Sequence, residues 1–166
     1  PAEPAAGAQP AEWMRRLDVA APAIARYLEL PSFMLDHAAL VRTNAVEGAP
    51  LAGTARYPVV VYSHGWNGFR AINTNQMEAL ASHGYVAVGI DHTYGALVTV
   101  LADGRVALNN PAALPDDAPD DVYQHASEQL EATYAADVEF VLDQLARLDA
   151  GAVDPRFAGR LDLGRI

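Results

Sequence analysis

The sequence has 166 residues, a length typical of a single domain. Hydrophobic residues make up 51% of it and charged residues 19%, a balance that excludes a disordered chain. The formal net charge is -10 and the 11 basic residues, all Arg, are scattered, so no nucleic-acid partner is expected. The absence of Cys excludes disulfides and a Cys nucleophile. No apolar run reaches the roughly 18 residues that a membrane span needs.

The first part of the chain is predicted to hold a proline-rich linker over residues 1–10 and a helical insertion over residues 10–43. Pro22 and Pro31 suit the first turns of short helices. Apolar residues recur at helical intervals through this part: Trp13, Leu17, Ile24, Leu28, Phe33, Met34, Ala38 and Val41. An apolar helical stripe usually faces a core, so we expect Trp13, Phe33 and Met34 to be packed inside; contact with lipid or an acyl chain is the alternative.

Residues 57–92 are predicted to form a βαβ unit. Residues 59–62 are a continuous apolar run, which indicates a strand covered on both faces, and residues 85–90 form a second such run. Between them the apolar residues follow helical spacing up to Gly84, which suits the end of a helix. Strands joined in this way are parallel in nearly all known cases, so the sequence predicts an α/β fold with a parallel sheet and flanking helices.

The remaining chain is predicted to add a hairpin and a long helix. Asp103 and Gly104 separate two short apolar runs and indicate a β-hairpin over residues 97–109. Beyond an acidic loop, an amphipathic helix is expected within residues 120–150. Its apolar stripe is spaced by three or four residues: Tyr123, Ala126, Leu130, Tyr134, Val138, Val141, Leu145 and Leu148.

The segment from Ser63 to Gly68 follows the first strand directly. In open parallel sheets, ligands bind at the carboxyl ends of the strands, so this segment has the expected position of a site. Gly65 and Gly68 are expected to let the backbone turn sharply and to expose its amides. Amides presented in this way can stabilise an oxyanion during acyl transfer.

Two stretches carry a resemblance to a known family: VVVYSHGWNGFR at residues 59–70 and MEALASHGYVAVGIDH at residues 77–92. Together they resemble the α/β-hydrolase superfamily, most of all the secreted platelet-activating-factor acetylhydrolase branch and its bacterial esterase and lipase relatives. The sequence departs from that pattern because two residues, not one, separate Gly65 from Gly68. The resemblance is close only over residues 57–92.

The resemblance implies that the backbone N–H of Trp66 contributes to an oxyanion hole, with His64, Gly65, Asn67 and Gly68 around the substrate. It also implies a serine nucleophile in a Gly-x-Ser-x-Gly turn, which these residues do not contain. We therefore expect a single partial domain, cut at both ends and inactive without its C-terminal half. Neither a metal nor a cofactor is expected, and the secreted relatives favour a location outside the cytoplasm.

Other polar residues have simpler interpretations. Adjacent side chains on a strand point to opposite faces, so Ser63 and His64 are not expected to share a proton. His64 is expected to anchor the turn, and His83 to lie at a solvated helix end. Asp91 and His92 are expected to have structural or pocket-lining roles, since with His64 they form no known metal-ligand set.

Two functions of different classes remain open. The first is the N-terminal part of a serine carboxylic-ester hydrolase that acts on a small ester or lipid, with possible contact to a membrane or lipid surface. The second is a non-catalytic α/β module that binds a ligand or a partner.

Overall fold

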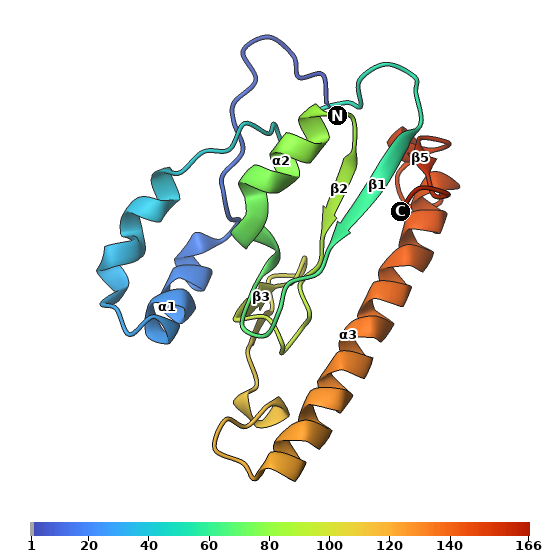
Figure 1. Ribbon diagram of the computed structural model, residues 1–166. Helices are drawn as coiled ribbons and strands as arrows, with labels where there is room; N and C mark the ends of the chain where they lie inside the picture. The colour runs from blue at the N-terminus through green and yellow to red at the C-terminus, as the bar shows by residue number, and fades with distance from the viewer. Residues whose placement is uncertain (1) are drawn as a thin grey trace.

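The structure, a computed structural model, describes residues 2–166 and is built around a three-stranded parallel sheet (Figure 1). The strands are β1 (Tyr57–Tyr62), β2 (Val86–Gly89) and β5 (Leu161–Asp162), in the order β2-β1-β5. β1 is central, and its register places Val59 opposite Val86 and Val61 opposite Val88. The predicted α/β class and the parallel sheet are confirmed.

The connection from β1 to β2 runs through a short 3-10 helix, η2 (Arg70–Asn73), and helix α2 (Thr74–Ser82). Gly84 adopts the left-handed conformation, with φ of 90°, directly after the helix. The N–H of Tyr85 then donates to the carbonyl of Leu80 at 3.1 Å, and the N–H of Gly84 to that of Ala81 at 3.1 Å. This is a Schellman motif, which satisfies helix carbonyls that would otherwise lack donors.

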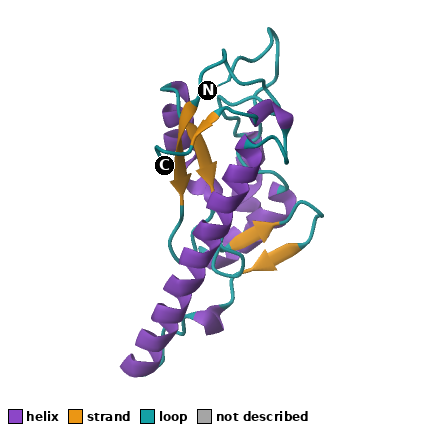
Figure 2. Ribbon diagram, turned by 90° about the vertical axis from the view of Figure 1, so that its right-hand side faces the viewer, coloured by secondary structure: helices purple, strands orange, loops and turns teal. Residues whose placement is uncertain are grey.

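Helix α3 (Asp120–Asp149) covers one face of the sheet, as Figure 2 shows. Val59, Leu145 and Leu161 are almost completely buried where it packs on the strands. Partly buried side chains surround them: Val61, Val86, Val88, Val141, Leu142, Leu148, Phe157 and Leu163. The N-terminal turns of α3 extend beyond the sheet (Figure 1), so Tyr123, at the start of the predicted stripe, is 40% exposed.

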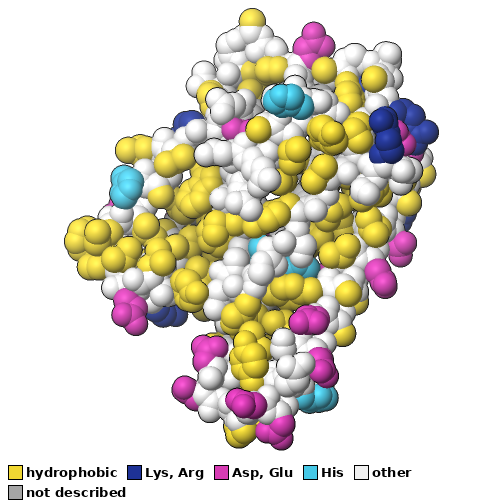
Figure 3. Space-filling model, in the orientation of Figure 1, with side chains coloured by type: hydrophobic (Ala, Val, Ile, Leu, Met, Phe, Trp, Pro, Cys, Tyr) yellow, Lys and Arg dark blue, Asp and Glu magenta, His cyan; other side chains and the backbone are white. Residues whose placement is uncertain are grey.

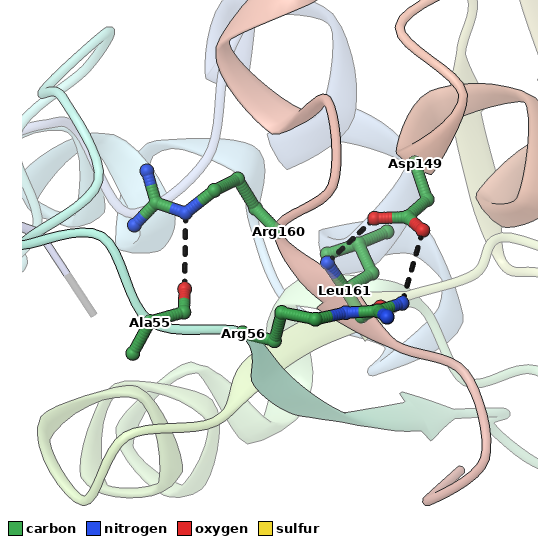
Figure 4. A network of polar contacts seen from close by, with 5 residues as sticks. All are labelled: Ala55, Arg56, Asp149, Arg160 and Leu161. Carbon is green, nitrogen blue, oxygen red and sulfur yellow. Dashed lines mark hydrogen bonds and ion pairs between the residues drawn. The ribbon is translucent and has the colours of Figure 1, made fainter.

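A network of polar contacts fastens β5 between β1 and the end of α3 (Figure 4). The Asp149 carboxylate accepts a hydrogen bond from the Leu161 N–H at 2.8 Å and forms an ion pair with Arg56 at 3.2 Å. Arg56 Nε also donates to the Leu161 carbonyl at 3.1 Å, and Arg160 Nε donates to the Ala55 carbonyl at 3.0 Å. These contacts place β5 on the edge of β1 opposite β2.

The N-terminal part of the chain contains helix α1 (Leu17–Tyr27) and a 3-10 helix, η1 (Ser32–Leu40). Pro31 precedes η1 directly, but Pro22 lies inside α1, so its predicted place in a first turn is wrong. The helix begins ahead of Pro22 because Leu17 already packs against an apolar cluster. Tertiary packing here outweighs the helix preference of proline.

Only part of the predicted apolar stripe of this region is buried. Trp13 packs against the cluster formed by Ala20, Ile24, Phe69, Leu97 and Val98, and its indole N–H donates to the Ala71 carbonyl at 2.9 Å. Trp13 is thus packed against the core as expected, although it is only partly buried. Phe33 and Met34 are 69% and 45% exposed, so the expectation that they lie in the core is wrong. The 3-10 helix η1 that carries them has no buried residue.

A separate two-stranded antiparallel sheet is formed by β3 (Val98–Val100) and β4 (Val106–Leu108), within the range where the sequence predicts a hairpin. Short 3-10 helices, η3 (Pro111–Ala113) and η4 (Pro155–Phe157), complete the elements. No helix in residues 2–166 combines the length and the apolar character needed to cross a membrane.

Candidate active site

The turn that follows β1 is held by backbone hydrogen bonds on both sides of Trp66. The N–H of Asn67 donates to the Gly95 carbonyl at 3.0 Å, and the N–H of Gly68 donates to the Gly65 carbonyl at 2.9 Å. The Gly68 carbonyl in turn accepts from the N–H of Leu97 at 3.0 Å. Across residues 2–166 the N–H of Trp66 has no hydrogen-bond acceptor. The turn therefore has an ordered backbone, and the Trp66 N–H within it is a donor without an acceptor.

The sharp bend comes from Asn67, whose φ is 60°, and not from a glycine. Asn tolerates the left-handed conformation better than most residues, so the bend needs no glycine at this point. Gly68 is required for a different reason: a Cβ there would lie 2.8 Å from His64 Cβ and 3.0 Å from the Gly65 carbonyl oxygen. A Cβ on Gly65 would meet no atom within 4 Å. The expectation that both glycines create the turn is corrected accordingly.

The buried side chain of His64 holds the turn in place through two hydrogen bonds. Its Nε2 lies 3.2 Å from the backbone N–H of His92, which donates to it. Its Nδ1 lies 2.8 Å from the Gly65 carbonyl, to which it must donate because Nε2 is the acceptor. Burial lowers the pKa of His64 below its ordinary value, which favours this neutral form at neutral pH. Neither ring nitrogen is free for a ligand.

Three side chains, from the segments after β1 and β2 and from α3, form a hydrogen-bonded chain beside the turn. Ser63 Oγ lies 2.8 Å from His92 Nε2, and His92 Nδ1 lies 2.8 Å from Asp137 Oδ2. The carboxylate can only accept, so Nδ1 carries the proton and Nε2 accepts the Ser63 hydroxyl. His92 is completely buried, Asp137 is partly exposed and Ser63 is exposed. This order of groups is the one that activates the nucleophile in serine hydrolases.

Tyr134 closes the far side of the His92 ring. The two rings stack with centroids 3.7 Å apart and planes 8° from parallel. Burial and the Asp137 charge raise the pKa of Tyr134, so the phenol stays protonated. A Cβ on Gly95 would lie 2.2 Å from Tyr134 Oη, so only glycine fits where this loop crosses the tyrosine. Tyr134 and Asp137 thus support His92 from one face of α3.

Sequence reasoning missed this chain because it tested Ser63 only against the adjacent His64. The signal that could have revealed these contacts is the two-residue alternation of side chains along the strands. Alternation continues from Val59 and Val61 to Ser63, and from Val86, Val88 and Ile90 to His92, so both polar side chains fall on the face that α3 covers. Asp137 lies three residues beyond Tyr134 and belongs to the helix stripe that faces them.

The remaining polar residues have structural roles. Asp91 accepts a hydrogen bond from the Arg70 N–H at 2.7 Å and pairs with the Arg70 guanidinium at 3.3 Å, which fixes the start of η2. His83 is exposed at the end of α2, where its Nδ1 lies 2.8 Å from the Ala79 carbonyl.

A cavity of 850 Å³ opens beside the turn. Trp66 and Asn67 form one wall, and Tyr27 of α1 lies on another. Leu97, Leu108 and Leu114 supply apolar surface, and Arg26, Asp116 and Asp117 supply charges. A volume of this size accommodates a small organic ligand next to the free amide.

Comparison with known proteins identifies the class of the fold. A ferulic acid esterase from Streptomyces cinnamoneus has a similar solved structure, with a TM-score of 0.56 and 31% sequence identity over 86% of this chain. The fold is thus that of an esterase of the α/β-hydrolase type. Residues 12–153 match the family described as platelet-activating factor acetylhydrolase, isoform II, and the chain belongs to this family.

Two curated relatives agree with this assignment. The platelet-activating factor acetylhydrolase of Canis lupus familiaris is 39% identical over 56 residues, and that of Cavia porcellus is 35% identical over 52 residues. These matches cover 34% and 31% of this chain, and 13% and 12% of the relatives. The match to the esterase structure covers 36% of that protein. The chain therefore matches only a minor part of each of these proteins.

The two glycines of the turn provide a test of its geometry. We expect Gly68→Ala to lower the free energy of unfolding by about 1–3 kcal/mol, because its Cβ would be forced against His64 Cβ and the Gly65 carbonyl. Gly65→Ala is the matched control and should keep the unfolding free energy of the unmodified protein. Urea unfolding followed by circular dichroism measures both; equal stability of the two variants would contradict the described turn.

Proposed function

We propose that these residues belong to a carboxylic-ester hydrolase that works through a serine nucleophile, and that the Trp66 N–H is a donor of its oxyanion hole. The observation that carries this proposal is the free amide of Trp66, in a turn whose following amides, those of Asn67 and Gly68, are already bonded. An unused donor held in a rigid turn is preorganised for charge that develops during reaction.

The chemistry follows from where that charge appears. Attack of a hydroxyl on an ester carbonyl converts the carbonyl oxygen into an oxyanion, which a fixed N–H binds more strongly than the uncharged oxygen. Loss of one such donor costs about 100- to 1000-fold in rate in known enzymes. The substrate would lie against Gly65, Asn67 and Gly68. His64 would hold the turn in place through its hydrogen bonds.

We place the nucleophile outside residues 1–166. None of the four serines lies in a Gly-x-Ser-x-Gly sequence. β5 occupies the edge of β1 opposite β2, so a serine delivered by a strand in that place would stand beside the turn. Within a single domain, these residues would supply an oxyanion donor and the C-terminal half would supply the nucleophile. Residues 1–166 alone would then be inactive.

A second candidate is Ser63 itself. It is exposed, and its hydroxyl is hydrogen-bonded to a histidine that a carboxylate orients. Geometry of this kind defines an activated serine irrespective of the order of residues in the chain. The first candidate is preferred because the family resemblance of the turn includes a nucleophile in a Gly-x-Ser-x-Gly sequence.

Covalent labelling separates these candidates. We expect a fluorophosphonate probe to label one serine of the full-length gene product outside residues 1–166, and residues 1–166 alone to be unlabelled and inactive on p-nitrophenyl acetate. Peptide mass spectrometry identifies the labelled residue. A label on Ser63 that Ser63→Ala abolishes would replace the proposal with the second candidate. A full-length product that is neither labelled nor active would favour the non-catalytic binding module.

We further propose that the 850 Å³ cavity holds the larger acyl groups of the ester. Trp66 contributes both the free amide and a wall of this cavity, so a carbonyl bound at the amide would lie beside the cavity and its leucines. Leu108 is the residue of β4 that lines the cavity, and it is 44% exposed there.

Filling the cavity should therefore change acyl selectivity. In the full-length product we expect Leu108→Trp to lower kcat/KM for p-nitrophenyl octanoate by about tenfold or more, with p-nitrophenyl acetate changed much less. Val106→Trp is the matched control: Val106 lies on the same strand and is 41% exposed, but it does not line the cavity. Equal losses on both esters for Leu108→Trp would exclude the cavity as the acyl site.

The surface of α1 and η1 supports contact with a lipid interface as part of the same proposal. Hydrophobic side chains gather over these helices at the left of Figure 3. Phe33 is 69% exposed and Leu40 77%, and Tyr27, 54% exposed, belongs both to this surface and to the cavity wall. Substrate could pass from a lipid surface to the cavity along this side. The family assignment, and not this surface, supports a location outside the cytoplasm, which we include in the proposal.

Vesicle binding tests this surface. We expect the double variant Phe33→Ser/Leu40→Ser to reduce co-sedimentation with phosphatidylcholine vesicles several-fold, because burial of apolar side chains drives adsorption. Phe140→Ser is the control, since Phe140 is 63% exposed on α3, an element outside this surface. Activity on soluble p-nitrophenyl acetate should be kept in all variants. Unchanged sedimentation of the double variant would remove the lipid-surface proposal.

A further inference from the structure

We infer that Asp137, His92 and Ser63 are positioning residues that hold the oxyanion donor in place. This inference rests on the proposed function, since it assigns a task to residues that support the Trp66 amide. The hydrogen bonds among these three residues join the end of β1 to the segment after β2 and to α3. They therefore connect the turn to both of these parts of the structure.

His92 is the point where these contacts meet. Its ring binds Ser63, at the start of the turn, and Asp137 on α3; its backbone N–H binds the ring of His64. The two ring bonds require one orientation of the completely buried imidazole, and the third bond holds the backbone that carries it. A buried, fully bonded group of this kind has few alternative positions.

The segment that His92 begins also holds the other side of the turn. The His92 carbonyl accepts from the N–H groups of Gly95 at 2.9 Å and Ala96 at 2.6 Å. This bend presents the Gly95 carbonyl to Asn67, the residue after Trp66. Both neighbours of the free amide are therefore fixed, directly or through His64, by the position of one histidine.

Asp137 determines which hydrogen-bond donors His92 presents. Because the carboxylate takes the Nδ1 proton, Nε2 is left as an acceptor for the Ser63 hydroxyl. An Asn at position 137 could donate its amide to Nδ1, which would shift the ring proton to Nε2 and reverse the contact with Ser63. The expected result is a displaced turn in a protein that still folds.

The test uses the full-length gene product and p-nitrophenyl acetate. We expect Asp137→Asn and Ser63→Ala each to lower kcat by roughly 10- to 100-fold with KM changed less than about threefold, since small misplacements of a catalytic group have effects of this size. The kcat of the double variant should be no lower than that of the more impaired single variant, because both residues act through the same hydrogen-bonded contacts. Asp143→Asn, an exposed carboxylate on the same helix, and Ser82→Ala, a serine next to His83, are the controls.

A second measurement does not depend on activity. Hydrogen exchange of the peptide covering residues 63–68 should become faster in Asp137→Asn and in Ser63→Ala, and should be unchanged in Asp143→Asn. Unchanged kcat and unchanged exchange in both variants would overturn the inference while leaving the proposed function intact. Faster exchange in a product with no esterase activity would support the positioning role and show that the proposed function fails. Loss of the fluorophosphonate label in Ser63→Ala would overturn the inference by making Ser63 the nucleophile.

Discussion

A single buried imidazole holds together the candidate site. His92 is completely inaccessible to solvent, yet it binds a hydroxyl, a carboxylate and a second histidine from three other positions in the chain. A buried polar ring is stable only when its hydrogen-bonding groups are satisfied, so each partner constrains the others. The turn around Trp66 takes its geometry from this arrangement.

The sheet brings those partners together. Parallel pairing of β1 with β2 sets Val61 opposite Val88. Ser63 lies two residues beyond Val61 and His92 four residues beyond Val88, so both leave the strands on the same face at the same edge. Helix α3 packs on that face through Leu145 and carries Asp137 to the site. The contacts of Arg56 and Asp149 keep β5 in place at the other end.

Much of this arrangement could be predicted from the sequence, because apolar period and glycine position report local structure directly. The parallel unit, the cap at Gly84 and the site at the strand end follow from such patterns. The exposure of Phe33 and the bend at Asn67 could not be predicted, since they depend on packing and on space around the neighbouring backbone. The Ser63–His92–Asp137 chain was accessible in principle, but only once alternation was extended past the strand ends.

The position of Asp137 on α3 has a consequence for how the protein matures. Its two partners in the chain belong to strand ends, so the contact exists only after the long helix has docked on the sheet. If the helix and the strands were formed but not yet packed together, the turn would lack its contacts with Asp137 through His92. The Ser63–His92–Asp137 contacts thus report that the tertiary structure is complete, which formation of the helix and the strands alone does not.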